Sequence, residues 1–260
     1  MNFTKLLLIT SLFLSTACYS KCDTQNDNQI YAPLKLSDTR YIVFRKSILP
    51  EAFSPEHEYQ ISLGVFNCTT NQFEEFGKLP YLATPGKVEA AFLARAKPDN
   101  EEQFFVVHSA EVGNAATGVN YATDYYNARV YNSNNGIFTA DNTLNEFFGA
   151  GGDIFEEDFD NIVYKYPYKD EASISKIIST EDYKALLQGK TLTKSIARKA
   201  YLHDEPLESE KTSKYLIKDD PVRLYSQTSG WCLVGYNNPR HGEIKGWVNC
   251  EYISDLFTQN

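Results

Sequence analysis

Histidine and cysteine are the residue types that could form a zinc site or a nucleophile–base pair in this chain. The four histidines are scattered along the sequence, at His57, His108, His203 and His241. None belongs to an HExxH, HxH or cysteine–histidine spacing, which a zinc site would require. His108 lies in an apolar run and could activate a cysteine, but Cys68 is better explained as a disulfide partner. We therefore predict that the chain is not an enzyme.

Carboxylates are concentrated between Asp153 and Asp160, directly after the glycine-rich bend at 149–152. Carboxylates beside flexible backbone are ligands for hard cations, but their spacing does not follow the EF-hand loop. The glycines also lack the spacing, the lysine and the hydroxyl residue of a phosphate-binding loop. A charge run of this kind is typical of an exposed face, so we predict a solvated acidic hairpin, with no metal and no other cofactor.

The N-terminus has the three parts of an export signal. Lys5 is followed by an apolar stretch from Leu6 to Leu14 and then by small residues that end at Ala17. The stretch is well under the roughly 20 residues that a membrane-spanning helix needs. We therefore predict a signal peptide over residues 1–17 and an exported protein.

The residues around Cys18 resemble the lipobox of bacterial lipoproteins, in which the cysteine is lipidated and becomes the mature N-terminus. Leu14 stands one position further from the cysteine than in most such boxes, and Ser15 holds the usual leucine place. The resemblance implies a lipid anchor on the periplasmic face of a bacterial membrane, with residues 18–29 as a polar tether. Ordinary signal-peptidase cleavage is the alternative.

Five cysteines are an odd number for an exported protein. Lipidation of Cys18 would leave four, which allow three connectivities. We favour the one that keeps each bridge within one domain, pairing Cys22 with Cys68 and Cys232 with Cys250. Free buried thiols are the alternative.

The charge balance speaks against a nucleic-acid partner. Lysine and arginine number 25 against 34 acidic residues, which gives a formal net charge of -9. The sequence also lacks the clustered basic residues that binding to a phosphate backbone requires. A hydrophobic content of 42% supplies one large or two modest cores, and we favour two.

Residues 30–194 form the first predicted domain, which is β-rich and resembles a β-sandwich. Runs rich in β-branched and aromatic residues, such as Tyr59–Phe66 and Gln103–His108, alternate with turn residues. The Asn-Gly turn at Gly136 predicts a hairpin that pairs 126–131 with 137–139.

Helix is expected only near the end of this domain, as a short closing segment. Apolar residues recur at helical spacing over Asp170–Ile178 and again over Thr180–Gln188. Thr180 is the expected N-cap of the second helix, and Gly189 is expected to end it. The composition changes after that helix, so the domain boundary is placed near 193–197.

The last segment, residues 197–256, contains short strands at close spacing with a turn behind each. Its motifs are Ile217–Val222, then Gly230–Tyr236 with Trp231 inside it, then Gly246–Val248 with Trp247 inside it. These motifs resemble the bacterial SH3-like (SH3b) domains of cell-envelope proteins, with Asp219 in a place where the family usually has glycine. The resemblance implies a five-stranded barrel that binds peptidoglycan, peptides or a neighbouring domain, and it implies no catalysis.

Aromatic residues of this segment are the candidate ligand platform. They are Tyr201, Tyr225, Trp231, Tyr236 and Trp247. Buried tryptophans more often pack a core than contact a ligand, so Trp231 and Trp247 have a second interpretation as barrel core. The three tyrosines are the more open candidates, because each offers a flat apolar face with a polar tip.

Together these features predict a non-enzymatic, lipid-anchored envelope protein whose SH3-like module docks onto a protein or onto peptidoglycan. A more specific version is an immunity protein that neutralises a toxin in the periplasm. The competing class is a cell-wall hydrolase or its accessory subunit, which would require a cysteine–histidine pair or a metal cluster in the first domain.

Overall fold

The computed structural model describes residues 22, 28–50, 54, 56–99, 101–113, 117–134, 136–156 and 160–258. The predicted signal peptide, Cys18 and most of the predicted tether lie outside these residues. Within the described ranges, no helix is long and apolar enough to cross a membrane. The structure is mainly β, with 50% strand and 13% helix, as the sequence predicts.

Two antiparallel sheets form the N-terminal part of the chain. The first is ordered β1-β2-β3-β4 and consists of β1 (Gln29–Lys35), β2 (Arg40–Ile48), β3 (Tyr59–Asn67) and β4 (Gln72–Lys78). The second is ordered β5-β6-β7-β8 and consists of β5 (Lys87–Ala94), β6 (Gln103–Ala110), β7 (Tyr125–Asn134) and β8 (Ile137–Ala140), with β9 (Ala150–Gly151) also paired to β7. A separate short pair joins β10 (Ile154–Phe155) to β11 (Ile162–Tyr164).

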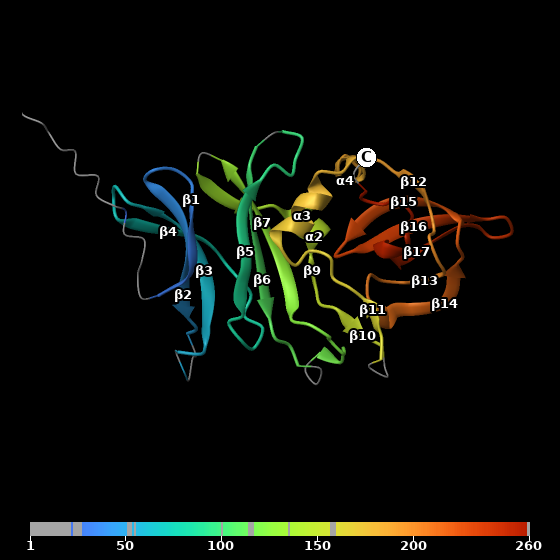
Figure 1. Cartoon of the computed structure of the whole chain (residues 1–260), viewed down its shortest axis with the longest axis horizontal. Helices are drawn as coiled ribbons and strands as arrows, with labels where there is room; N and C mark the ends of the chain where they lie inside the picture. Colours follow the sequence, from blue (N-terminus) through green and yellow to red (C-terminus); the bar gives the residue numbers. More distant parts are fainter. Residues whose placement is uncertain are drawn as a thin grey trace, which may run out of the picture.

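The second sheet is covered on both faces. All eight residues of β6 are buried, and successive side chains of a strand point to opposite faces. Phe104 and Val106 join the cluster shared with the first sheet, whereas Phe105 and Val107 join the cluster shared with the helices. Figure 1 shows the resulting layers, with the first sheet, the second sheet, the helices and the C-terminal strands following one another across the molecule.

The hairpin predicted at Gly136 is present. β7 pairs with β8, and Asn134 lies opposite Ile137. Gly136 adopts a φ of +79°, which a tight hairpin turn requires and glycine tolerates. Arg40 of β2 donates a hydrogen bond of 2.8 Å to the Gly136 carbonyl, which attaches the turn to the first sheet.

Both predicted helices are also present, as α3 (Glu171–Ile178) and α4 (Glu181–Leu187). Thr180 caps α4 by accepting a hydrogen bond from the Tyr183 amide, and Gly189 follows the helix with a φ of +71°. The expectation that helix occurs only there is wrong, because α2 (Asn142–Phe148) forms between β8 and β9. Its seven residues are too few for a periodic pattern to stand out from the neighbouring strands.

Six strands form the C-terminal sheet. They are β12 (Leu192–Ser195), β13 (Ala200–His203), β14 (Lys211–Leu216), β15 (Pro221–Thr228), β16 (Trp231–Asn238) and β17 (Gly242–Asn249), in the order β12-β15-β16-β17-β13-β14. Two short 3-10 turns, η1 (Glu208–Glu210) and η2 (Cys250–Tyr252), complete this part of the chain. β12 begins before the predicted boundary, and it pairs with β15 from Leu192 opposite Leu224 to Ser195 opposite Pro221.

The end of β12 is hydrogen-bonded to the turn that follows β14. The Ile196 amide donates to the Asp220 carbonyl at 3.0 Å, and the Asp219 amide donates to the Ile196 carbonyl at 2.8 Å. Asp219 has a φ of +68°, in the left-handed region that glycine favours and aspartate tolerates. Asp219 therefore has a backbone conformation that glycine adopts readily.

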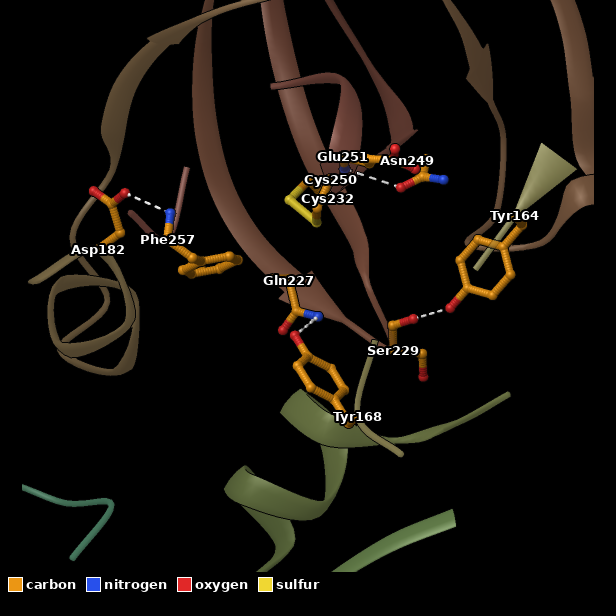
Figure 2. The surroundings of a disulfide bond; sticks show 10 residues. All are labelled: Tyr164, Tyr168, Asp182, Gln227, Ser229, Cys232, Asn249, Cys250, Glu251 and Phe257. Atoms are coloured by element: carbon orange, nitrogen blue, oxygen red, sulfur yellow. Dashed lines mark hydrogen bonds between the residues drawn. A yellow bond between two sulfur atoms is a disulfide. The ribbon is translucent and has the colours of Figure 1, made fainter. Parts of the chain in front are cut away.

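The C-terminal sheet packs directly against the N-terminal part. Trp231 belongs to the same buried cluster as Phe148 of α2, and its ring stacks on that of Tyr164 with centroids 5.2 Å apart. The Gln227 side-chain amide and the Tyr168 hydroxyl form a hydrogen bond of 2.8 Å, which Figure 2 shows below the C-terminal strands. One continuous apolar cluster therefore joins the two parts of the chain.

Two disulfides have the predicted connectivity. Cys22 pairs with Cys68, with Cα atoms 5.5 Å apart. Cys232 pairs with Cys250, with Cα atoms 5.1 Å apart, and this bond lies between β16 and the end of β17 (Figure 2). Because Cys232 is fully buried, this bond lies within the core of the C-terminal sheet.

Candidate binding cleft at the junction of the two parts

A cleft of about 830 Å³ opens where the N-terminal part meets the C-terminal sheet. We call it the junction cleft. One wall comes from Thr117–Tyr121, from β9 with β10, and from β11; the other comes from Pro206–Ser209, Lys211, the Thr228–Ser229 turn and Trp231. Its volume is within the range of clefts that bind small molecules or short peptide segments.

Close backbone packing shapes the N-terminal wall of the junction cleft. A side chain at Gly152 would place its Cβ 2.8 Å from the Tyr121 ring and 2.9 Å from the Asp124 carbonyl oxygen. A side chain at Gly149 would meet the Ser229 hydroxyl, whose oxygen accepts a hydrogen bond from the Ala150 amide at 3.2 Å. Gly149 thus lets the two parts of the chain approach each other, whereas Gly152 allows close packing within the N-terminal part.

Aromatic rings supply much of the apolar lining. The Tyr121 and Tyr125 rings meet edge to face, with centroids 5.5 Å apart. The stacked rings of Tyr164 and Trp231 border the cleft where the two walls meet, and the Tyr164 hydroxyl donates to the Ser229 carbonyl. Burial raises the pKa of all three tyrosines above its ordinary value, so their hydroxyls are neutral at physiological pH.

Among the residues that the structure describes, three charged side chains also line the cleft. Glu156 follows β10 on one wall, whereas Glu208 and Lys211 belong to the other wall. Burial raises the pKa of the Glu208 carboxyl; the Lys211 charge opposes this effect and the Glu156 charge adds to it. Two carboxylates on opposite walls therefore influence each other across the junction cleft.

Of the five aromatic residues predicted as a ligand platform, only Trp231 lines this cleft. It is 3% exposed, and Trp247 is half-buried against the same cluster, so both rings serve as packing. Tyr236 is half-buried and packs against the core of the C-terminal sheet. Tyr201 and Tyr225 lie on β13 and β15, and the contacts of the described residues do not unite the three tyrosines in one groove.

Tyr201 and Tyr225, which are also half-buried, contact cations. Lys199 donates a hydrogen bond of 2.9 Å to the Tyr201 hydroxyl, which lowers the pKa of that tyrosine. The Lys211 ammonium lies 4.6 Å from the centroid of the Tyr201 ring. Tyr225 has the Lys245 ammonium 4.3 Å from its ring centroid and donates a hydrogen bond to Glu243.

The histidines lie in structural surroundings. His108 is fully buried and donates from Nε2 to the Pro85 carbonyl at 2.9 Å, and His203 donates from Nδ1 to the Leu207 carbonyl at 2.9 Å. His57 and His241 are exposed. Across the described ranges, no histidine side chain hydrogen-bonds to a cysteine or a carboxylate, and no group of three His, Cys, Asp or Glu residues is placed to hold a metal.

His108 gives the protein a predictable response to acid. Burial lowers the pKa of His108 below its ordinary value of 6.5, so on acidification the unfolded chain takes up a proton before the folded chain does. The stability that the neutral ring contributes is complete above that value and is lost as the pH falls below it, by at most about 1.4 kcal/mol per pH unit.

We therefore expect an H108Q variant to lose less stability than the wild type between about pH 7.5 and about pH 5.5. Urea unfolding at the two pH values measures the difference. H203Q is the matched comparison. It is expected to change the pH dependence in the same direction, because burial also lowers the pKa of His203. An unchanged pH dependence in H108Q would contradict the prediction.

The predicted acidic hairpin needs a partial correction. Asp153 is buried rather than solvated: it forms an ion pair of 2.7 Å with Lys169 and accepts a hydrogen bond from the Tyr166 amide. Glu156 and Asp160 are exposed as expected, and residues 157–159 lie outside the described ranges. The run is therefore divided between a structural carboxylate and the rim of the junction cleft.

Sequence reasoning missed the cleft residues Tyr121, Tyr125, Glu208 and Lys211. They lie in two stretches about 90 positions apart, and none is part of a recognisable motif. The excess of tyrosine, 18 residues, was the one available signal, but it does not indicate which rings meet. Comparisons of the chain with protein-family models, with curated proteins and with solved structures find no significant match to any of the three.

Proposed function

We propose that this chain is an exported, lipid-anchored binding protein that holds a peptide ligand in the junction cleft, without catalysing a reaction. The junction cleft carries the proposal, because its lining combines aromatic faces, backbone polar groups and a few charged side chains from both parts of the chain. Peptides occur both in proteins and in the cross-links of peptidoglycan. The proposed peptide ligand could therefore belong to a partner protein or to the cell wall.

We further propose that the N-terminal sheets form a β-sandwich and that the C-terminal sheet is an SH3-like barrel. The conformation of Asp219 and its hydrogen bonds to Ile196 support the second assignment, since they bring the turn after β14 onto β12. The shared cluster around Trp231 supports a fixed arrangement in which the barrel completes one wall of the site. The surroundings of His108 and His203 favour binding over hydrolysis, because both rings are engaged with backbone carbonyls.

Filling the junction cleft tests the proposal. Ser209 is exposed and lines the cleft, whereas Ser213 is exposed on β14 and does not. The full chain is used to select ligands from a random peptide library and is also sedimented with purified peptidoglycan. We expect S209W to weaken the retained ligand roughly tenfold or more by steric exclusion, and S213W to bind like the wild type.

The library selection and the peptidoglycan sedimentation together identify the source of the ligand. Retention on peptidoglycan alone indicates cell-wall peptides, and selection from the library alone indicates a protein partner. Equal binding by S209W and the wild type in both arms would rule out the junction cleft as the site. Solubilisation of the peptidoglycan by the wild type would instead favour the hydrolase alternative.

A further inference from the structure

The half-buried carboxylate of Glu208 has the charge of Lys211 in its vicinity but no close ion-pair partner among the described residues. The described residues provide no hydrogen bond or ion pair to its side chain, although it lines the junction cleft. Lys211, three residues further along at the start of β14, acts on Glu208 without forming an ion pair, and its ammonium lies 4.6 Å from the centroid of the Tyr201 ring. A partly desolvated carboxylate without a partner is costly, and such groups are concentrated at functional sites.

Glu156 adds a second carboxylate to the lining of the cleft. It lies on the opposite wall, and its charge acts on Glu208, so the two carboxylates repel each other across the cleft. Glu156 accepts a hydrogen bond of 3.3 Å from the Asn161 side chain, which holds its carboxylate in place without neutralising it. A cation placed between the walls would interact favourably with both carboxylates at once.

The aromatic lining suits the same kind of ligand group. Tyr121 and Tyr125 present neutral rings to the cleft, and ring faces attract ammonium and guanidinium groups. The overall charge of -9 also attracts cationic ligands over distance. The two carboxylates outnumber the single Lys211 charge in the described lining, so charge and ring chemistry together favour a cation.

We infer that the junction cleft recognises a cationic side chain, the ammonium of lysine or the guanidinium of arginine, held between Glu208 and Glu156. This inference rests on the proposed function, because it names the group by which the bound peptide is selected. Both walls of the cleft would then contact the cation, since each wall contributes one carboxylate.

Small probes of matched shape test the inference. Nα-acetyl-lysine amide carries the ammonium, and Nα-acetyl-norleucine amide is its neutral counterpart. Binding to the full chain is followed by the tryptophan fluorescence of Trp231, which borders the cleft, and by NMR shifts of the surrounding amides. We expect the lysine probe to bind roughly tenfold or more tightly than the norleucine probe, as for a charge-assisted hydrogen bond.

Two variants and one control locate the effect. E208Q and E156Q should each remove most of the lysine preference. E205Q makes the same charge change on an exposed residue of the same loop that does not line the cleft, and it should keep the preference. The carboxyl 13C shift of Glu208 provides a second readout, because a bound cation should lower the pKa of that carboxyl.

The outcomes separate this inference from the proposed function. Equal binding of the two probes in the cleft would overturn the cation inference and leave peptide binding intact. Stronger binding of Nα-acetyl-glutamate amide would also overturn it and would point to recognition through Lys211. If neither probe nor any library peptide perturbs the cleft, both the inference and the proposed function fail.

Discussion

Replacing Trp231 with alanine is expected to lower the free energy of unfolding by about 3–5 kcal/mol, the range for a large aromatic removed from a packed core. The Trp231 ring is 3% exposed, stacks on Tyr164 and meets the His203 ring edge to face at 4.7 Å. It also belongs to the cluster that continues into α2 through Phe148. Its loss therefore leaves a cavity at the contact between the two parts of the chain.

Urea unfolding followed by far-UV circular dichroism measures this effect. Trp247 is the matched control, because its ring is half-buried against the same cluster and its truncation should cost less. We also expect W231A to increase hydrogen exchange in β11 and β13, whose Tyr164 and His203 rings contact the Trp231 ring, before it affects β2 and β3. A loss below about 1 kcal/mol would mean that the junction relaxes into the space left by the ring.

Removing the Cys232–Cys250 disulfide is expected to cost about 3 kcal/mol of stability. The bond closes a loop with a sequence separation of 18 residues, and the unfolded chain gains the corresponding freedom when it is removed. C232A with C250A is the suitable variant pair, since alanine fits the buried position of Cys232 without adding a polar group.

The second disulfide provides the comparison. C22A with C68A removes a bond that joins the N-terminal segment to the turn after β3, far from the C-terminal sheet in the chain. We expect it to leave hydrogen-exchange protection in β15–β17 unchanged, whereas C232A with C250A should reduce it. Equal protection in both variants would show that the core around Val234 and Val248 holds these strands without the bond.

Local patterns in the sequence were sufficient for much of the fold. The helices α3 and α4 follow from their caps and apolar spacing, and the β7–β8 hairpin follows from the turn at Gly136. The disulfide connectivity was predicted by keeping each bridge within one predicted domain. In contrast, α2 was missed because its seven residues are stabilised by burial of Leu144 and Phe148 rather than by a long pattern.

The candidate site was far less accessible to sequence reasoning. Aromatic residues of the C-terminal segment stood out by their spacing, but spacing does not reveal that Trp231 is covered by Tyr164, a residue 67 positions earlier in the chain. Nor does it reveal that Glu156 and Glu208 face the same cleft. Both relations depend on how the C-terminal sheet packs against β10 and β11, which is a long-range property.

The pairing of β12 with β15 bears on any attempt to move the C-terminal segment into another protein. A fragment cut at Ala197, where the predicted C-terminal segment begins, would lack β12 and leave the outer edge of β15 open to pairing with other chains. It would also expose the Trp231 face that α2 and Tyr164 cover. A transplantable unit would have to begin before Leu192 and carry a substitute for that covering surface.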